Sequence, residues 1–419
     1  MSLLEDLFVA YYDARTHKRN TINQLHFEME LEENLVGLYR EIDERRYRVG
    51  RSVCFMITNP VKREVFAADF RDRVVHHLLF NYINPIFEPT FIADCYACRK
   101  GKGTLYGIQR LDKHIRSCSD NYRKPCYILK LDLRGYFMNI NRQILFDIIN
   151  RRMRLFGRKR NQAGVLHKET PEYEVAMYLI PLIVFNDPVD SCLRKGAKEE
   201  WEGLPASKSL FFSPEGCGLP IGNLTSQLFS NIYLNEFDNH VKRVLGIRHY
   251  GRYVDDFYLV HNDRQYLLSL IPVIRDYLMD SRGAVLHPDK IRLVDHRQGI
   301  TFLGSVVKPY RIGLSGRIFR QFDQCLEHWS RKLSRDDEWD LATRMELRAS
   351  VNSYLGIMVH FNTMRRKKEV VERHPYLYRL GYFSNHMDKF ILKKQEKEKE
   401  EERLMSGVAD ATASVKCDV

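Results

Sequence analysis

The sequence predicts an α+β fold in which strands carry the chemistry and helices lie toward both ends of the chain. Two runs rich in aromatic and branched apolar residues, 127–132 and 252–260, have the composition of strands, and each includes acidic residues. Residues 1–50 and the segment after Gly316 have the apolar spacing of helices instead. At 419 residues, the chain is long enough for about two or three subdomains with an ample core.

The first 50 residues contain one clear apolar stripe. Leu31, Leu35, Leu38 and Ile42 recur at the spacing of one helix face. Such a stripe must be buried, so we expect these helices to cover a neighbouring element.

Asp255 and Asp256 are adjacent in the middle of the strand-like run 252–260. Because side chains alternate faces along a strand, a tight hairpin turn is the simplest arrangement that presents both carboxylates. Two close carboxylates repel each other unless they are protonated or neutralised, and a divalent metal is the usual remedy at a catalytic turn. Acidic turns are also common on solvated surfaces, so a plain surface turn is the alternative.

A third acid, Asp132, ends the apolar run 127–132 and precedes a turn that contains Gly135. This pattern places a carboxylate at the carboxyl end of a central strand. If Asp132 and Asp255 face each other across neighbouring strands, they can hold two Mg²⁺ ions about 3.5–4 Å apart. One ion would lower the pKa of an attacking hydroxyl and the other would stabilise the departing phosphate oxygen, which is the chemistry of nucleotidyl transfer.

The charge of the chain favours a polyanionic partner. There are 66 Lys and Arg residues against 54 Asp and Glu residues, a formal net charge of +12. A basic run opens the segment 151–217, where RNA contact and a solvated helix face are equally good interpretations. The basic helical segment after Gly316 is suited to holding a duplex by its phosphates.

Composition also bounds the location of the protein. The longest apolar stretch, 175–185, contains Pro181 and is too short to cross a bilayer, so we expect no membrane partner. Glu5 and Asp6 interrupt the first apolar segment, so we expect no secretion signal. Nine cysteines, an odd number, suit free thiols in a reducing cytoplasm.

Cys95 and Cys98 form a C-x-x-C pair, and His114 and Cys118 follow as further candidate ligands. A zinc site is therefore an alternative use of these residues. A single pair of this spacing is a weak pattern for zinc, because structural sites normally combine two such pairs.

Several blocks in a fixed order make the sequence resemble a reverse transcriptase. They extend over about residues 50–310, and such an ordered series is far more specific than any one block. The resemblance implies a right-hand polymerase with fingers, a palm built on an antiparallel sheet, and a helical thumb. The blocks are Arg63, Asp132 with Phe137, 222–227, 253–256, Lys290 and 302–304.

The same resemblance implies a subdomain layout. The expected parts are an N-terminal helical extension (1–50), fingers (51–125), a palm (126–310) with an insertion at about 151–217, a helical thumb (311–390) and a charged, disordered tail (391–419).

Two segments, 96–104 and 218–227, resemble the enzymes of diversity-generating retroelements. Group II intron and retroviral relatives have Gln where this chain has Ile221, and usually Pro where it has Gln227. The subgroup implies cDNA synthesis that is error-prone at template adenines, with a small accessory variability protein and a structured noncoding RNA as partners. Two alternatives stay open: a reverse transcriptase of antiphage defence with its own noncoding RNA, and a non-catalytic RNA-binding scaffold.

The resemblance also implies catalytic roles. Asp132, Asp255 and Asp256, with the Leu133 backbone, would hold two Mg²⁺ ions, and Mn²⁺ is an alternative metal. Lys290 would donate a proton to the pyrophosphate leaving group.

Further residues would bind the template, primer and deoxynucleoside triphosphate. Phe137 would exclude ribonucleotides as a steric gate beneath the sugar. Ile221 in place of Gln removes hydrogen bonds, which weakens discrimination because apolar contact separates similar ligands by only ~1–3 kcal/mol. We therefore expect Ile221 and Arg63 together to loosen selection opposite adenine. The implied nucleotide-binding residues are Lys62, Arg63, Arg134, Gly135, Tyr136, Phe137, Ile221 and Gly222, and the implied primer grip is Phe302, Leu303 and Gly304.

Overall fold

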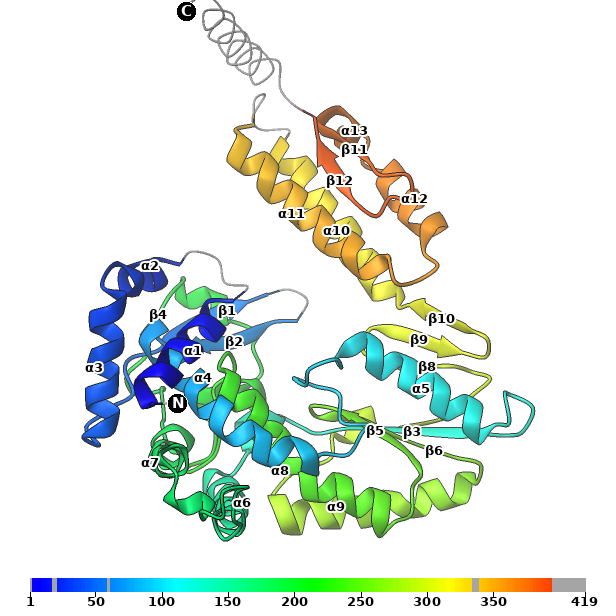
Figure 1. The fold of residues 1–419 in the computed structure, drawn as a ribbon. Helices are drawn as coiled ribbons and strands as arrows, with labels where there is room; N and C mark the ends of the chain where they lie inside the picture. The colour runs from blue at the N-terminus through cyan, green and yellow to red at the C-terminus, as the bar shows by residue number, and fades with distance from the viewer. Residues whose placement is uncertain (1, 17–20, 59–60, 334–338, 394–419) are drawn as a thin grey trace, which may run out of the picture. The chain divides into compact units, whose positions relative to one another are not determined.

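The chain folds into two compact units of mixed helix and sheet, so the predicted α+β class is confirmed (Figure 1). The first runs from the amino terminus to Gly299 and the second begins at Ile300; we call them unit 1 and unit 2. The computed structural model describes residues 2–16, 21–58, 61–333 and 339–393.

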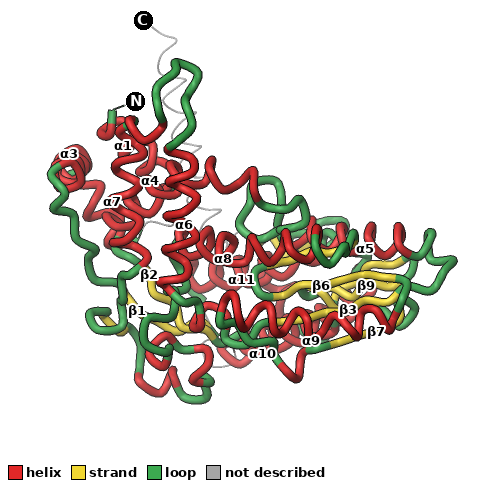
Figure 2. The backbone as a smooth tube through the Cα atoms, turned by 90° about the horizontal axis from the view of Figure 1, so that it is seen from below, coloured by secondary structure: helices red, strands yellow, loops and turns green. Residues whose placement is uncertain are grey.

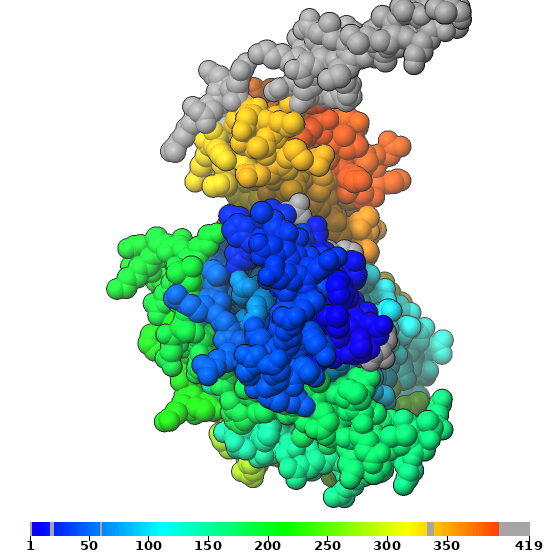
Figure 3. All heavy atoms as spheres, turned by 60° about the vertical axis from the view of Figure 1, so that its left-hand side comes forward, coloured from blue at the N-terminus to red at the C-terminus, as the bar shows by residue number. Residues whose placement is uncertain are grey.

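Unit 1 opens with the helices predicted for its first 50 residues. The apolar stripe of α3 is buried, since Leu35, Leu38 and Ile42 are each at most 1% exposed and belong to the main core. Ser2 and Glu5 form a capping box at the start of α1. In the space-filling view these N-terminal helices, coloured blue, form one face of the unit (Figure 3). The predicted helices are α1 (Leu3–Arg15), α2 (Ile22–Met29) and α3 (Leu31–Asp43), and a fourth helix, α4 (Phe70–Phe87), follows further along the chain.

A small sheet of order β2-β1-β4 combines two strands that lie between α3 and α4 in sequence with a short strand at residues 193–194. Its strand β2 begins at Arg63 and turns Glu64 and Phe66 inward. Glu64 is 1% exposed and accepts hydrogen bonds from the Trp201 indole N–H at 2.8 Å and the Leu210 backbone N–H at 2.7 Å. These bonds attach residues 201–210 to β2. The strands are β1 (Val53–Ile57), β2 (Arg63–Ala67) and β4 (Leu193–Arg194).

The predicted central strand is β3, which lies between β6 and β7 in an antiparallel sheet of order β5-β6-β3-β7. Helix α5 packs against one face of this sheet, and α8 and α9 pack against the other (Figures 1 and 2). The strands are β3 (Tyr127–Asp132), β5 (His249–Tyr253), β6 (Asp256–His261) and β7 (Arg292–Asp295), and the helices are α5 (Thr104–Cys118), α8 (Leu224–Arg243) and α9 (Arg264–Arg282).

The register sorts the side chains of this sheet onto two faces, because they alternate along each strand. Asp132 pairs with Asp256 on the face toward α5. Leu131 pairs with Phe257 on the other face, where the Phe257 and Phe237 ring centroids lie 5.3 Å apart. The sheet therefore presents its acids on one face and anchors itself to α8 with the other.

Between β3 and α8 the chain forms two helices and several short turns. α6 continues across residue 151, the expected start of the insertion, because its buried positions Leu145, Ile149 and Met153 recur at four-residue spacing. No helix in the described ranges is both long enough and apolar enough to cross a bilayer. The α-helices are α6 (Arg142–Gly157) and α7 (Pro171–Val184), and the 3₁₀ helices of unit 1 are η1 (Glu88–Thr90), η2 (Tyr136–Asn139), η3 (His167–Glu169), η4 (Lys198–Trp201), η5 (Ala206–Lys208), η6 (Leu210–Phe212) and η7 (Pro288–Lys290).

Unit 2 contains the helices predicted after Gly316. Phe322 of α10 and Leu347 of α11 are 0% exposed and lie in its core. The unit also has a two-stranded sheet that a purely helical thumb would not include. The predicted tail, 391–419, begins inside β12, and its residues from 394 onward lie outside the described part of the chain. The elements are β8 (Ile300–Phe302), β9 (Ser305–Lys308), β10 (Arg311–Leu314), α10 (Gly316–Leu333), α11 (Leu341–Met358), α12 (Met364–Glu372), α13 (Tyr376–Leu380), β11 (Gly381–Phe383) and β12 (Phe390–Leu392).

Replacing Gly251 of β5 tests how closely side chains approach the central sheet. An added Cβ would meet the hydroxyl oxygen of Tyr96 and would lie 2.6 Å from that of Tyr258. Both tyrosines are 0% exposed, so they have no space to move. We expect Gly251→Ala to lower the free energy of unfolding by about 1–3 kcal/mol, measured by urea denaturation.

The control is Gly37→Ala in α3, where an added Cβ meets no atom within 4 Å. This substitution is expected to raise the free energy of unfolding by about 0.5–1 kcal/mol, because alanine loses less backbone entropy in a helix. An equal effect of the two substitutions would contradict the close approach at Gly251.

Candidate active site

Strands β5 and β6 are joined by the hairpin that the acidic pair predicts. Tyr253 pairs with Asp256, so Val254 and Asp255 are the two turn residues. Val254 has a φ of 58°, which is rare for a β-branched residue and costs about 1–3 kcal/mol. Such strain persists only where the surroundings hold the backbone, and it clusters at functional sites.

Asp132, at the end of β3, lies beside this hairpin. Asp132 pairs with Asp256 in the register of the sheet. The backbone N–H of the next residue, Leu133, donates to the Asp255 carbonyl oxygen at 3.3 Å. Asp132 therefore meets the acidic pair, from which it lies far apart in the sequence, at one end of the sheet. One detail differs from the expectation: Asp256 lies directly across from Asp132, because Asp255 occupies the turn.

Two lysines neutralise two of these carboxylates. Lys290 Nζ lies 2.7 Å from Asp132 Oδ1, and Lys130 Nζ lies 3.0 Å from Asp256 Oδ2. The Asp132 and Asp256 side chains are 14% and 18% exposed, so a small ligand can still reach them. Lys290 is a predicted site residue but Lys130 is not. Its signal is in the sequence, because a residue two positions before Asp132 on a strand shares the same face.

Negative charge is concentrated at the hairpin. Burial, reinforced by the Asp132 carboxylate, raises the pKa of Asp255 to about 6, while Arg63 acts in the opposite direction. Burial also raises the pKa of Asp256 to about 6 despite the nearby Lys130. Both carboxylates are thus held at a cost in their charged forms.

The donor chemistry of this site fits a hard divalent cation. Carboxylate oxygens are the ligands that Mg²⁺ and Mn²⁺ prefer. Oδ1 of Asp256 is buried without a hydrogen-bond partner, whereas buried acceptors are normally satisfied. Across residues 2–393, leaving out the gaps noted above, no three His, Cys, Asp or Glu side chains are arranged to hold a metal ion already. The carboxylates hold lysine ammonium groups instead, so a metal would compete with Lys130 and Lys290.

Three of the predicted nucleotide-binding residues, Phe137, Ile221 and Gly222, lie beside β2 or its apolar cluster. The Ile221 carbonyl accepts the Phe66 N–H of β2 at 2.8 Å, and the Leu219 N–H donates to the Phe137 carbonyl at 2.8 Å. Gly222 has a φ of 128°, and an added Cβ would lie 2.9 Å from the Phe66 carbonyl oxygen, so only glycine fits there. Phe137 and Ile221 both pack, partly buried, against a small apolar cluster of Cys54, Phe66, Met138 and Leu210.

The turn after β3 contains three of the predicted nucleotide-binding residues, Arg134, Gly135 and Tyr136. Gly135 has a φ of 56°, and a Cβ there would lie 2.6 Å from the Ser207 carbonyl oxygen, so the turn requires glycine. The Arg134 N–H donates to the Val285 carbonyl at 2.9 Å and is therefore occupied. The N–H groups of Gly135 and Tyr136 remain as candidates for contact with a triphosphate.

The remaining predicted site residues are Lys62 and the primer grip at 302–304. The Lys62 ammonium donates to the Glu202 carbonyl at 2.5 Å and so contacts the segment after α7. Phe302, Leu303 and Gly304 belong to unit 2, where the last two form the turn between β8 and β9. Their φ values of 50° and 79° are typical of a two-residue hairpin. The turn is therefore present, and its role as a primer grip stays a prediction.

A buried ion pair supports the hairpin from the face toward α8. Arg252 of β5 and Asp238 of α8 are both 0% exposed, and Arg252 Nη2 lies 2.7 Å from Asp238 Oδ2. Burial lowers the pKa of Arg252, but Asp238 more than offsets this and raises it well above its usual range. The sequence run around the acidic pair includes Arg252 but gives no sign of its partner, which is brought there only by tertiary packing.

The zinc alternative receives no support from the surroundings of the cysteines. Cys95 is buried, and its sulfur is hydrogen-bonded to Asn231 at 3.4 Å and to Arg252 at 3.5 Å, whereas Cys98 is exposed. The cysteines of the described ranges are free thiols.

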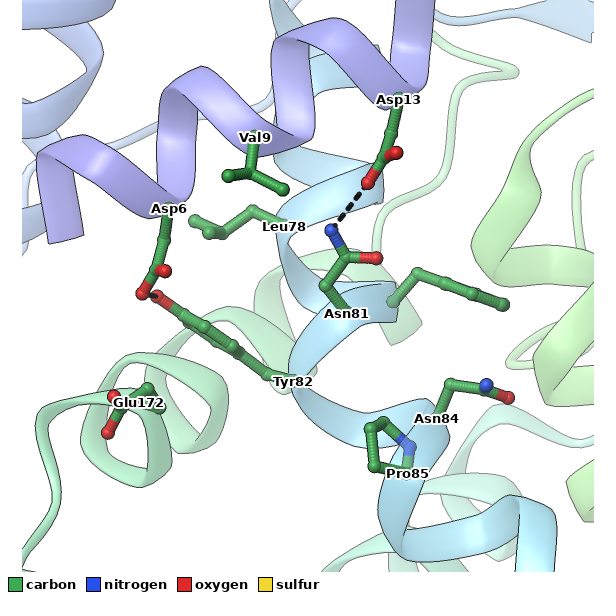
Figure 4. Close-up of a pocket in the computed structure, with 10 residues that line it drawn as sticks. Asp6, Val9, Asp13, Leu78, Asn81, Tyr82, Asn84, Pro85 and Glu172 are labelled. Atoms are coloured by element: carbon green, nitrogen blue, oxygen red, sulfur yellow. Dashed lines mark hydrogen bonds between the residues drawn. The ribbon is translucent and has the colours of Figure 1, made fainter. Parts of the chain in front are cut away.

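A cavity of about 500 Å³ lies between α1 and α4, outside the predicted site (Figure 4). Four of its polar side chains pair with each other. The Tyr82 hydroxyl donates to Asp6 at 2.6 Å, and the Asn81 amide donates to Asp13 at 2.8 Å. We interpret this cavity as a packing gap between helices.

Residues 180–307 match the family model "Reverse transcriptase (RNA-dependent DNA polymerase)". The chain contains a reverse transcriptase domain. This match supports the predicted enzyme class, RNA-directed DNA polymerase. The matched region includes Asp255, Asp256 and Lys290 but begins after Asp132, which β3 holds beside β6 of the reverse transcriptase domain.

The chain is also similar to individual proteins. It is 22% identical to Protein YkfC of Escherichia coli (strain K12) over 305 residues, which are 65% of this chain and 68% of YkfC. It resembles the structure of telomerase from Candida albicans in complex with a TWJ fragment of telomeric RNA, with a TM-score of 0.44 and 12% identity over 87% of this chain and 62% of that one. For apo telomerase from Candida tropicalis the TM-score is 0.45, with 11% identity over 79% and 61%. The chain spans less than two thirds of these telomerase chains.

The hairpin carboxylates predict how stability depends on pH without divalent metal. The pKa of Asp255 in the folded state, about 6, lies above the ordinary value of 3.8. The folded state therefore binds more protons than the unfolded state between these values, so the free energy of unfolding falls as pH rises from about 4 to 6. Asp255→Asn removes this loss and is expected to be more stable than the parent by about 1–3 kcal/mol at pH 7 but not at pH 4.

Urea denaturation in EDTA across this pH range measures the difference. Asp280→Asn, on the exposed face of α9, controls for the removal of one carboxylate. Added Mg²⁺ should stabilise the parent at pH 7 by mass action and so narrow its gap to Asp255→Asn. Superimposable pH profiles of the parent and Asp255→Asn would contradict the raised pKa of Asp255 in the folded state.

Proposed function

We propose that the protein synthesises cDNA on an RNA template by two-metal nucleotidyl transfer. The observation that carries this proposal is the meeting of Asp132, Asp255 and Asp256 at one end of the central sheet, beside a reverse transcriptase domain match. Reverse transcriptase domains in general use divalent metal ions, and the oxygen donors present here favour Mg²⁺.

Asp132, Asp255 and Asp256 would hold the metal ions, with the Leu133 carbonyl as a further oxygen donor. When bound, such ions lower the pKa of the attacking hydroxyl and stabilise the departing pyrophosphate oxygen. The buried, unpartnered Oδ1 of Asp256 supports its assignment as a ligand rather than as a simple turn acid.

The two lysines would behave differently when metal ions and nucleotide bind, since only Lys290 would leave its carboxylate. Lys290 is 49% exposed, so its ammonium group can leave Asp132 without breaking a packed structure. Once released, it lies near the end of β3 and can donate a proton to the leaving pyrophosphate. Lys130 is 20% exposed and more confined, so we assign it to balancing the charge of Asp256.

The deoxynucleotide would bind between the acidic end of the sheet and β2. The juxtaposition of Phe137, Ile221 and β2 supports this assignment. Phe137 would lie beneath the sugar and exclude a 2′-hydroxyl by contact. Arg63, at the start of β2, partly opposes the rise in the pKa of Asp255. This electrostatic effect supports a position of Arg63 near the acids and its proposed contact with the triphosphate.

The biological setting we favour is a diversity-generating retroelement, with a structured noncoding RNA and a small variability protein as partners. The motifs at 96–104 and 218–227 carry this choice. Antiphage defence is the competing setting, and a non-catalytic scaffold is the competing function. Sequencing the RNA that copurifies with the protein separates the first two, since only a retroelement supplies a template repeated elsewhere in the genome with changes at adenines.

The scaffold is tested by primer extension on an RNA template with Mg²⁺. We expect the parent to extend the primer and the double variant Asp255→Asn, Asp256→Asn to be slower by roughly 1,000-fold or more, because the metal ligands are lost. The matched control is Asp276→Asn, Asp280→Asn, which removes two exposed carboxylates from α9. No extension by the parent with either Mg²⁺ or Mn²⁺ would reject the polymerase proposal.

Ile221 is predicted to set the accuracy of copying opposite adenine. Its side chain is apolar and partly buried, so it offers packing without hydrogen bonds. Replacing Ile221 by Gln restores an amide, and we expect it to lower the frequency of errors at template adenines by roughly tenfold. Deep sequencing of the cDNA measures this, and Ile221→Val separates the effect of size from that of hydrogen bonding. An unchanged error frequency in Ile221→Gln would remove Ile221 as the cause.

A further inference from the structure

Arg252 uses its guanidinium group to join three parts of unit 1. Its Nε and Nη2 atoms each lie 2.7 Å from a different oxygen of Asp238, which is a bidentate pair. Its Nη1 donates to the carbonyl oxygen of Val254 at 2.8 Å. Its Nη2 also contacts Cys95 Sγ at 3.5 Å. A guanidinium has five N–H groups, so nearly all of its capacity is used within this buried cluster.

The ion pair is also anchored on both sides. Asp238 accepts a further hydrogen bond, at 2.6 Å, from the hydroxyl of Tyr250, which lies on the same face of β5 as Arg252. The backbone of Arg252 is hydrogen-bonded to the backbone of residues 94–96. The Arg252 N–H donates to the Asp94 carbonyl at 2.9 Å, and the Arg252 carbonyl accepts from the Tyr96 N–H at 3.0 Å. The guanidinium therefore has a fixed position from which to act on the hairpin.

The group it acts on is the strained residue of the turn. Val254 has a φ of 58°, and its carbonyl immediately precedes Asp255 in the chain. Holding this carbonyl fixes the peptide plane between the two residues, and with it the start of the Asp255 backbone. On the other strand, the Leu133 N–H holds the Asp255 carbonyl at 3.3 Å. The turn is thus held before and after the carboxylate-bearing residue.

We propose that Arg252 is a positioning residue of the polymerase site, because its guanidinium ties the Val254 carbonyl to α8 and thereby fixes Asp255. The role in catalysis rests on the proposed function, whereas the hold on the turn does not. A buried ion pair that served stability alone would not need its third contact. Replacing an arginine by lysine keeps the charge but cannot reproduce the bidentate pair and the carbonyl contact together.

Arg282 provides a matched control. It is also buried, at 5% exposure, and it also joins its element to α8, since Nη2 lies 2.6 Å from Glu236 and Nε donates to the Tyr233 carbonyl at 2.6 Å. Its guanidinium donates to Tyr233, Ser281 and Glu236, which all lie outside the hairpin. Arg252→Lys and Arg282→Lys each disturb a buried arginine that is paired with an acid of α8, and only the first also releases the turn.

The first readout is hydrogen exchange of the peptide amides around 250–258. We expect Arg252→Lys to speed exchange at the hairpin by roughly fivefold or more relative to Arg282→Lys, after both are corrected for global stability. A Val254→Gly background should reduce this effect, because glycine adopts a positive φ without strain and needs no hold. Equal hairpin exchange in Arg252→Lys and Arg282→Lys overturns the proposal, as does an undiminished effect in the glycine background.

The second readout is steady-state primer extension per folded molecule. We expect Arg252→Lys to lower kcat by roughly 10–100-fold and to raise the Mg²⁺ concentration for half-maximal rate, with KM for the deoxynucleotide changed by less than about threefold. Arg282→Lys should match the parent in metal dependence. If the hairpin loosens but kcat and metal dependence stay at the parent's values, the positioning role is rejected. If the parent itself fails to extend a primer while the hairpin loosens, the proposed function fails and the hold on the turn stands.

If Arg252→Lys does not fold, Asp238→Asn replaces it in both assays. This variant keeps the shape of the carboxylate and removes its charge, so it weakens the anchor of Arg252 without emptying the site. The same outcomes apply, with Glu236→Gln as its matched control.

Discussion

Electrostatic repulsion among Asp132, Asp255 and Asp256 is the constraint on which the rest of unit 1 depends. Two unit charges about 4 Å apart interact by about 4 kcal/mol near a protein surface, and by more where water is excluded. Two lysines reduce this repulsion by pairing with Asp132 and Asp256. Asp255 lies in the turn, and burial together with Asp132 raises its pKa to about 6. A further positive charge at this site would therefore stabilise the charged form of Asp255.

The central sheet can accommodate this charge because one face bears the acids and the other packs against helices. The face toward α5 presents the acids, while the face toward α8 buries apolar rings such as Phe257 together with one ion pair. A buried ion pair contributes little net stability, because desolvation offsets its Coulombic gain. Its value here is geometric, since a charged group in a fixed place can hold a strained backbone where an apolar side chain offers no donor.

Much of this arrangement was predictable from the sequence, and the parts that were not have a common cause. The helix stripe through Leu35, the central strand ending at Asp132 and the acidic hairpin all follow from local periodicity and composition. Asp238 and the occupied N–H of Arg134 depend on contacts between distant segments, which no local pattern encodes. Lys130 lies between these cases: strand periodicity places it beside Asp132, but only the register of β6 brings it to Asp256.

Strain and charge crowding at one hairpin support the same functional conclusion. Val254 stores backbone strain, and the carboxylates beside it store repulsion, so the turn is costly to the metal-free protein in two independent ways. A fold that served only to bind RNA would gain nothing from either cost. In our proposal, a divalent cation would relieve this repulsion, and the strained turn would hold the Asp255 backbone in place for it. The two costs therefore have one common explanation if this end of the sheet binds cations.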